Sequence, residues 1–215
     1  MSHDDFQIEP IPGLPEHLPQ GEEILWQGRP NIWALTKDAL NFRWVMGYFA
    51  LLAGWRFVSA IDMMPAARAA AISTPFLIMG AIVGALLMIT AVIQARCTVY
   101  TITNKRVAMR IGAALTVTLN IPFSQLENAA LGLTKRGQGN IALMTKGDTR
   151  FSFLVLWPHA RPWQFARTQP CLRAIDDAQQ VADILASAAQ SSITKQTVKT
   201  QAAQPDFAHS HPQAS

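Results

Sequence analysis

From Ala69 to Ala95 the sequence contains no charged residue, and this stretch constrains the fold more than any other feature. Within it, a helix over Pro75–Ala95 would be roughly 32 Å long at 1.5 Å per residue. That length matches the ~30 Å hydrocarbon core of a bilayer. The sequence therefore predicts a transmembrane helix over residues 75–95.

A second apolar stretch precedes it, over Trp44–Ile61, and predicts the first transmembrane helix. This stretch is interrupted by Arg56, a residue type that costs about 2.5–3.5 kcal/mol at the centre of a membrane helix. Arg56 lies near the end of the span, so its long stem can carry the guanidinium to the headgroups near Asp62. Alternatively, Arg56 pairs with a partner membrane subunit or a pigment-bearing helix.

Basic residues flank the two spans and predict their orientation. They lie before the first span and after the second, whereas the connecting segment, 62–74, contains only Arg68. The positive-inside rule then places both termini in the cytoplasm, in a multi-pass membrane protein. The net charge of +4 is ascribed to these cytoplasmic loops rather than to nucleic-acid binding.

Small residues recur on the second span at roughly four-residue spacing, at Gly80, Gly84 and Ala91. Such residues let helix backbones approach closely. They are expected to pack the two spans against each other, with dimerisation as the alternative.

Outside the spans, side-chain alternation with a period of two predicts β-strands. A first strand, 22–30, precedes the membrane, and turn signals such as Asn104-Lys105 separate the later ones. These later strands are expected at 97–103, 106–112, 114–122, 125–133, 140–145 and 150–156. Short strands at this spacing indicate an antiparallel sheet that curls into a sandwich or partial barrel. The predicted domain, 97–190, includes the strand before the membrane, so the hairpin is an insertion.

An apolar face with helical periodicity predicts a helix over 176–190 that caps the curled sheet. The proline-rich segment 1–21 is expected to be an extended arm. Residues 191–215 are rich in Ser, Thr, Gln and Ala without periodicity, and are expected to be disordered.

No residue pattern indicates an enzyme, a metal site or a cofactor site. His209 and His211 could hold a metal only weakly, and Gly137-Gln138-Gly139 is followed by a strand pattern rather than by a phosphate-binding helix. Cys97 and Cys171 fall in segments assigned to the cytoplasm, where thiols stay reduced.

The stretch Trp157–Arg173 is the candidate partner-binding loop. It combines aromatic and basic residues with three prolines, and Trp and Arg are enriched at binding hot spots. Its candidate contact residues are Trp157, His159, Arg161, Trp163, Phe165 and Arg167. Two other interpretations stay open: the tryptophans cover the domain's own core, or the loop rests at the lipid interface.

Three basic residues around the first predicted hairpin turn, Lys105, Arg106 and Arg110, are expected to face anionic lipid headgroups. Each such residue contributes on the order of 1 kcal/mol near a charged membrane surface. Specific headgroup recognition and contact with a protein partner are the alternatives.

Two sequence segments carry a family resemblance. EEILWQGRP before the hairpin and TVYTITNKRVAMRIG after it resemble the membrane-anchored bacterial pleckstrin-homology-like domains. That resemblance implies a bent sheet of about seven strands capped by one C-terminal helix.

Within that group, GLPEHLPQGEEILWQGRP, WVMGYFALLAGWRF and FLVLWPHARPWQFARTQPCLRAI look like the photosynthetic complex assembly proteins of purple bacteria. Those proteins are encoded beside the reaction-centre H subunit. The resemblance implies a dimeric, non-enzymatic assembly factor for the reaction centre and the light-harvesting 1 complex. The alternative function is a lipid-binding or envelope-organising module unrelated to photosynthesis.

Overall fold

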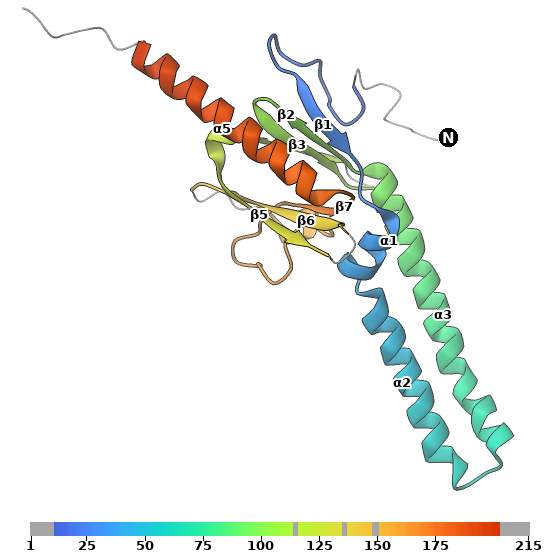
Figure 1. The fold of residues 1–215 in the computed structure, drawn as a ribbon. Helices are drawn as coiled ribbons and strands as arrows, with labels where there is room; N and C mark the ends of the chain where they lie inside the picture. The colour runs from blue at the N-terminus through green and yellow to red at the C-terminus, as the bar shows by residue number, and fades with distance from the viewer. Residues whose placement is uncertain (1–10, 114–115, 135–136, 148–150, 203–215) are drawn as a thin grey trace, which may run out of the picture.

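The computed structural model describes residues 11–113, 116–134, 137–147 and 151–202. These form a mainly-β domain and a long helical hairpin that projects from one end of it (Figure 1). The hairpin consists of α2, Phe42–Ile61, and α3, Ala66–Cys97. Both helices are long and apolar enough to cross a membrane.

Helix α3 begins well before the predicted start at Pro75. Pro65 precedes the helix, and Pro75 lies inside it. The alanine-rich segment Ala66–Ala71 has high helix propensity, so the helix continues on the N-terminal side of Pro75. The predicted loop 62–74 was therefore wrong, and the helices are joined by Asp62–Pro65.

The small residues of α3 pack against α2, as expected. Gly80 and Gly84 are buried, and a Cβ atom at Gly80 would lie 2.9 Å from Cβ of Phe49. At Gly84 it would lie 3.1 Å from the sulfur of Met46. The glycines thus allow the aromatic and methionine side chains of α2 to approach the backbone of α3.

The described residues of the domain form seven strands in two antiparallel sheets, which confirms the fold class expected from the sequence. The first sheet has the order β1-β2-β3-β4 and the second has the order β5-β6-β7. The strands are β1 Ile24–Gly28, β2 Val99–Thr103, β3 Arg106–Ile111, β4 Val117–Pro122, β5 Leu126–Leu133, β6 Gly139–Thr145 and β7 Cys171–Ile175. Because β1 pairs with β2, the hairpin is an insertion within the first sheet.

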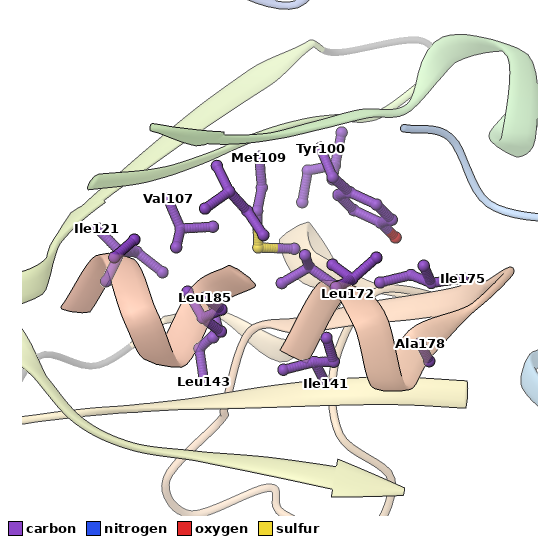
Figure 2. Packing of buried hydrophobic residues seen from close by; sticks show 14 of the residues in the cluster. Tyr100, Val107, Met109, Ile121, Ile141, Leu143, Leu172, Ile175, Ala178 and Leu185 are labelled. Carbon is purple, nitrogen blue, oxygen red and sulfur yellow. The ribbon is translucent and has the colours of Figure 1, made fainter. Parts of the chain in front are cut away.

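The core lies between the two sheets and is closed by helix α5, Ala178–Ala202 (Figure 2). Tyr100 and Met109 come from the first sheet, Leu143 and Leu172 from the second, and Leu185 from the helix. Inward side chains at every second strand residue explain why the alternation predicted these strands.

Helix α5 starts close to the expected residue but ends later. Residues 191–202 continue the helix, so the prediction of disorder from residue 191 was wrong for this part. The segment contains no Gly or Pro to end the helix. Residues 203–215 lie outside the described residues.

The strand predicted over 150–156 was also wrong. A short helix, α4 Phe153–Leu156, lies there instead, and the edge of β6 pairs with β7, a strand that the sequence pattern did not predict. A short apolar run such as FLVL cannot be assigned to helix or strand by periodicity alone. Leu156 is buried in the core all the same.

The proline-rich segment is not simply an extended arm. Its described part makes a tight turn, with a β-bridge between Ile11 and Leu14, and buries Leu14. Gly13 has φ +86°, and a Cβ there would lie 2.6 Å from the Val99 side chain. The segment therefore covers the outer face of β2. Residues 1–10 lie outside the described part.

The link from β1 to the hairpin consists of α1, Ile32–Ala34, and the π-helical turn η2, Leu35–Ala39. Leu35 packs with Ala95 of α3 and Ala174 of β7 in a second, smaller apolar cluster. Asn41 then takes the left-handed conformation, φ 53°, and α2 begins. A short 3₁₀ turn, η3 Phe123–Gln125, connects β4 to β5.

Candidate binding surface on the α4–β7 loop

The loop between α4 and β7 is closed at its base by backbone pairing. Ala160 and Pro170 form an isolated antiparallel β-bridge. The Arg161 N–H donates to the Gln169 carbonyl (3.0 Å), and the Cys171 N–H donates to the His159 carbonyl (2.8 Å). Residues 161–169 therefore project from a fixed base rather than from two free strands of chain.

Aromatic rings are exposed on this projection. The exposed fraction is 86% for Trp163, 63% for Phe165 and 45% for Trp157. The Phe165 ring lies 4.8 Å from that of Phe153 and 6.4 Å from that of Trp163. The aromatic patch is defined here as these rings with the exposed and half-buried apolar residues of α4: Phe153, Leu154, Val155, Trp157, Trp163 and Phe165.

An apolar cluster of this kind on a surface is a candidate contact site, because isolated exposed apolar residues are common but grouped ones are not. Most of its residues are large aromatics, which supply contact area at low cost in side-chain entropy. One interpretation had the tryptophans covering the domain's own core. The structure instead places Trp163, and Phe165 beside it, at the surface.

His159 does not belong to the exposed surface, which corrects its assignment as a contact residue. It is fully buried, with Nδ1 2.6 Å from the Tyr100 hydroxyl and Nε2 3.0 Å from the Thr98 hydroxyl. Burial, aided by the positive charge of Arg173, lowers the pKa of His159 from 6.5 to about 3. Burial likewise raises the pKa of Tyr100. Both side chains are neutral at physiological pH and fasten the loop to the start of β2.

Arg173 fastens the loop to the segment that enters the hairpin. Its guanidinium donates to the carbonyls of Pro158 (3.5 Å) and Ala160 (3.3 Å) at the loop base, and to that of Asp38 (3.2 Å) in η2. Through Thr98 and Asp38, the loop is thus joined to the segment that leaves α3 and to the segment that enters α2.

Sequence reasoning did not identify Thr98, Tyr100 or Asp38 as part of this site. These residues are more than fifty positions from the loop, and no local pattern links them. Arg173, on β7 of the second sheet, contacts Tyr100, on β2 of the first, and strand β7 was not predicted.

The two other arginines of the loop make internal contacts. The Arg161 side chain donates to the Gln169 side chain (3.0 Å), and Arg167 donates to the carbonyl of Gly147. Arg161 is half-buried, whereas Arg167 remains exposed at the rim. Arg167 is therefore more accessible than Arg161, and a role of either residue in partner contact stays a prediction.

The basic residues of the β2–β3 hairpin do not form the predicted membrane-facing set. Strand β2 leaves α3 and runs away from it, so the turn at Asn104-Lys105 lies at the end of the sheet remote from the helical hairpin (Figure 1). Lys105 is exposed there, Arg106 pairs with Glu22 at 2.8 Å, and Arg110 is buried. Burial follows because β3 is covered on both faces.

Arg56 is exposed on α2, in its last two turns. Among the described residues, no ion pair involves it. Its predicted reach toward Asp62, or toward a partner helix, stays a prediction.

The described residues contain no group of three or more His, Cys, Asp or Glu side chains arranged to hold a metal ion. His209 and His211 lie outside them. Both cysteines are free, and burial raises the pKa of the Cys171 thiol to about 12. The arrangement around the loop can present a contact surface, and its buried polar groups hold that surface in place.

Comparison with known proteins gives two findings. The family described as "Bacterial PH domain" matches residues 46–189. A Rhodobacter capsulatus protein described as "Uncharacterized 23.7 kDa protein in puhA 5'region" is 46% identical over 202 residues, which cover 92% of this chain and 94% of the relative. No solved structure matches significantly.

Proposed function

The chain belongs to the bacterial PH domain family, and from this premise we propose that it is a non-enzymatic assembly factor of the bacterial inner membrane. Its clients are subunits of the photosynthetic reaction centre and the light-harvesting 1 complex. The protein holds a subunit beside the membrane until the neighbouring subunits arrive.

The helical hairpin supports the membrane part of the proposal. Most of its large apolar side chains face outward, including Leu51, Val58, Ile82 and Leu86. In water these side chains would be costly to expose, whereas in a bilayer they face lipid. Basic residues cluster at the domain end of both helices, so the domain lies on the cytoplasmic side.

The observation that carries the proposal is the aromatic patch on a base that is tied to both helices of the hairpin. His159 and Arg173 fix this base to Thr98 and Asp38. Because the base of the loop is fixed, less entropy is lost when a partner docks. A patch of a few exposed aromatic rings suits reversible binding, which an assembly factor needs in order to release its client.

The similar protein of Rhodobacter capsulatus supports the choice of client. Its description places it in the puhA 5' region. That position agrees with the sequence resemblance to assembly proteins encoded beside the reaction-centre H subunit.

Affinity purification of a tagged chain from gently solubilised membranes, during induction of photosynthesis, tests the proposal. We expect reaction-centre or light-harvesting 1 subunits to be enriched over an unrelated tagged membrane protein. The double variant Trp163→Ala/Phe165→Ala should lose these subunits while its own level stays unchanged, because both rings are exposed. Leu133→Ala, at an exposed apolar residue of β5, is the matched control.

Recovery of only the chain itself and lipid, also after crosslinking, would contradict a direct assembly role. It would favour the alternative of a lipid-binding or envelope-organising module. A second, differently tagged copy in the eluate would test the homodimer that the resemblance implies.

A further inference from the structure

Two hollows lie where η2 and the first turn of α2 meet the domain. Their volumes are about 780 and 740 Å³, and they share walls formed by Lys37, Asp38 and Arg43. One is completed by Trp33, Thr134 and Gln138 among others. The other is completed by Trp44, Gly47, Asn140 and Arg173.

We propose that this junction binds the phosphate headgroup of an anionic phospholipid, held by Lys37, Arg43 and Arg173. The inference rests on the proposed placement of the hairpin in a membrane, but not on the assembly role. The site is distinct from the β2–β3 basic residues. Lys105 and Arg106 lie at the remote end of the sheet, and Arg110 is buried and lines neither hollow.

Charge at the junction favours an anion. Three cationic side chains line it against one carboxylate, Asp38. Among the described residues, no ion pair neutralises Lys37, Arg43 or Arg173. Only 6% of Arg173 is exposed, and three backbone carbonyls hold its guanidinium in place. These carbonyls take three of its five N–H groups, so the side chain is fixed at the hollow and adds its positive charge there with little loss of side-chain entropy.

The start of α2 adds to this field. Its first turn contains no acidic residue, and no side chain caps it. The positive end of the helix dipole therefore remains available to an anion beside Arg43. The backbone of Asn41 is in the left-handed conformation, and the helix end that follows it lines the hollow that also contains Arg173.

The surroundings select a lipid over free phosphate. Trp33 and Trp44 are 59% and 81% exposed at the hollows, and tryptophan prefers the headgroup level of a bilayer. Gly47 lies one turn further along the apolar helix, and a Cβ atom there would meet nothing within 4 Å. A ligand can thus place its phosphate among the cations and its acyl chains along α2.

Native mass spectrometry of the full-length chain in detergent, with added phosphatidylglycerol or phosphatidylcholine, tests the proposal. We expect preferential retention of phosphatidylglycerol. Each of Lys37→Gln and Arg43→Gln should weaken it about fivefold to tenfold, as expected for loss of one basic contact.

The matched control is Arg96→Gln. Arg96 is an exposed cation in the last turn of α3, at the same end of the hairpin, and it does not line either hollow. Equal losses in Arg43→Gln and Arg96→Gln would overturn the site in favour of unspecific attraction to charged lipid. Displacement of the lipid by inorganic phosphate alone, at matched ionic strength, would overturn the assignment to a lipid.

Flotation with phosphatidylcholine vesicles separates this inference from the proposed function. A chain that floats but shows no preference for phosphatidylglycerol overturns the headgroup site alone. A chain that does not float overturns the membrane placement and the site with it. Failure to recover photosynthetic subunits in the affinity purification contradicts the assembly role and leaves the lipid result intact.

Discussion

The Nδ1 atom of His159 lies 2.6 Å from the hydroxyl oxygen of Tyr100, which joins the base of the α4–β7 loop to strand β2. The same oxygen accepts the backbone N–H of Arg173 at 3.2 Å. The hydroxyl proton is then free to point at Nδ1, which leaves the Nε2–H of the neutral ring for the Thr98 hydroxyl. The Tyr100 hydroxyl thus connects three segments of the chain, namely β2, the loop base at His159 and β7.

Removing the Tyr100 hydroxyl should destabilise the domain. Tyr100→Phe leaves the His159 ring nitrogen and the Arg173 N–H without their buried partner, which costs about 1–3 kcal/mol. Chemical unfolding of the purified chain in detergent measures this change. Tyr48→Phe removes the same group from an exposed residue of α2 and should have no measurable effect. Equal stability of the two variants would show that the Tyr100 contact does not hold the loop.

The depressed pKa of His159 predicts acid lability. The unfolded chain takes up the histidine proton below pH 6.5, whereas the folded chain does so only near pH 3. Stability is therefore fully present above pH 6.5 and falls as the pH drops toward 3, by about 1.4 kcal/mol per pH unit. The charged and titratable groups around the ring are Tyr100 on β2 and Arg173 on β7.

The comparison that isolates this proton is His159→Gln, which keeps a polar side chain and cannot titrate. Between pH 7 and pH 5 the unmodified chain should lose about 2 kcal/mol more stability than the variant. Unfolding midpoints at several pH values give the two slopes. Parallel slopes would mean that His159 takes up its proton in the folded state.

The sequence predicts the parts of this fold that depend on local pattern. Alternation identifies β2 and β3, because Tyr100, Ile102, Val107 and Met109 all face one core. The absence of charged residues identifies the second helix of the hairpin, because this signal too is local in the sequence. Strand β7 was missed because Arg173 interrupts its apolar pattern, and that arginine is buried only through carbonyls supplied by other segments.

The candidate site divides in the same way. Exposed Trp163 and buried His159 belong to one aromatic and basic stretch of sequence, and composition cannot separate them. His159 is buried because the hydroxyl groups of Thr98 and Tyr100 form hydrogen bonds with its ring nitrogens in the interior. Trp163 has no such partner among the hydrogen bonds described and lies at the surface. Such partners are long-range, so only the assembled fold identifies them.

Helix packing in the hairpin depends on Gly80. A methyl group there would lie 2.9 Å from Cβ of Phe49, so Gly80→Ala must push the helices apart. We expect a loss of about 1–3 kcal/mol, as for other overpacked interiors. Gly54→Ala, on α2 with nothing within 4 Å of the added carbon, should be neutral or stabilising by up to about 1 kcal/mol, because alanine favours a helix over glycine. Thermal unfolding in detergent compares them, and equal midpoints would contradict the packing of α2 against α3.

An ion pair between Glu22 and Arg106 fixes the start of the first sheet, before the chain enters the hairpin. Glu22 is buried, and one carboxylate oxygen accepts from Arg106 Nε at 2.8 Å and from the Thr103 hydroxyl at 2.9 Å. These contacts hold the start of β1 against β2 and β3. Glu22→Gln removes the negative charge to which Arg106 and Thr103 donate, and should lower the free energy of unfolding by about 1–3 kcal/mol.

Neighbouring Glu23 provides the control, because its side chain is exposed and Glu23→Gln makes the same change of charge. Hydrogen exchange of the β1 amides should accelerate in the Glu22 variant alone. Because β1 leads directly through α1 and η2 into α2, the faster exchange should extend to these two turns. Acceleration confined to residues 22–28 would instead show that the link is held by the apolar contacts of Leu35 with Ala95 and Ala174, independently of the sheet.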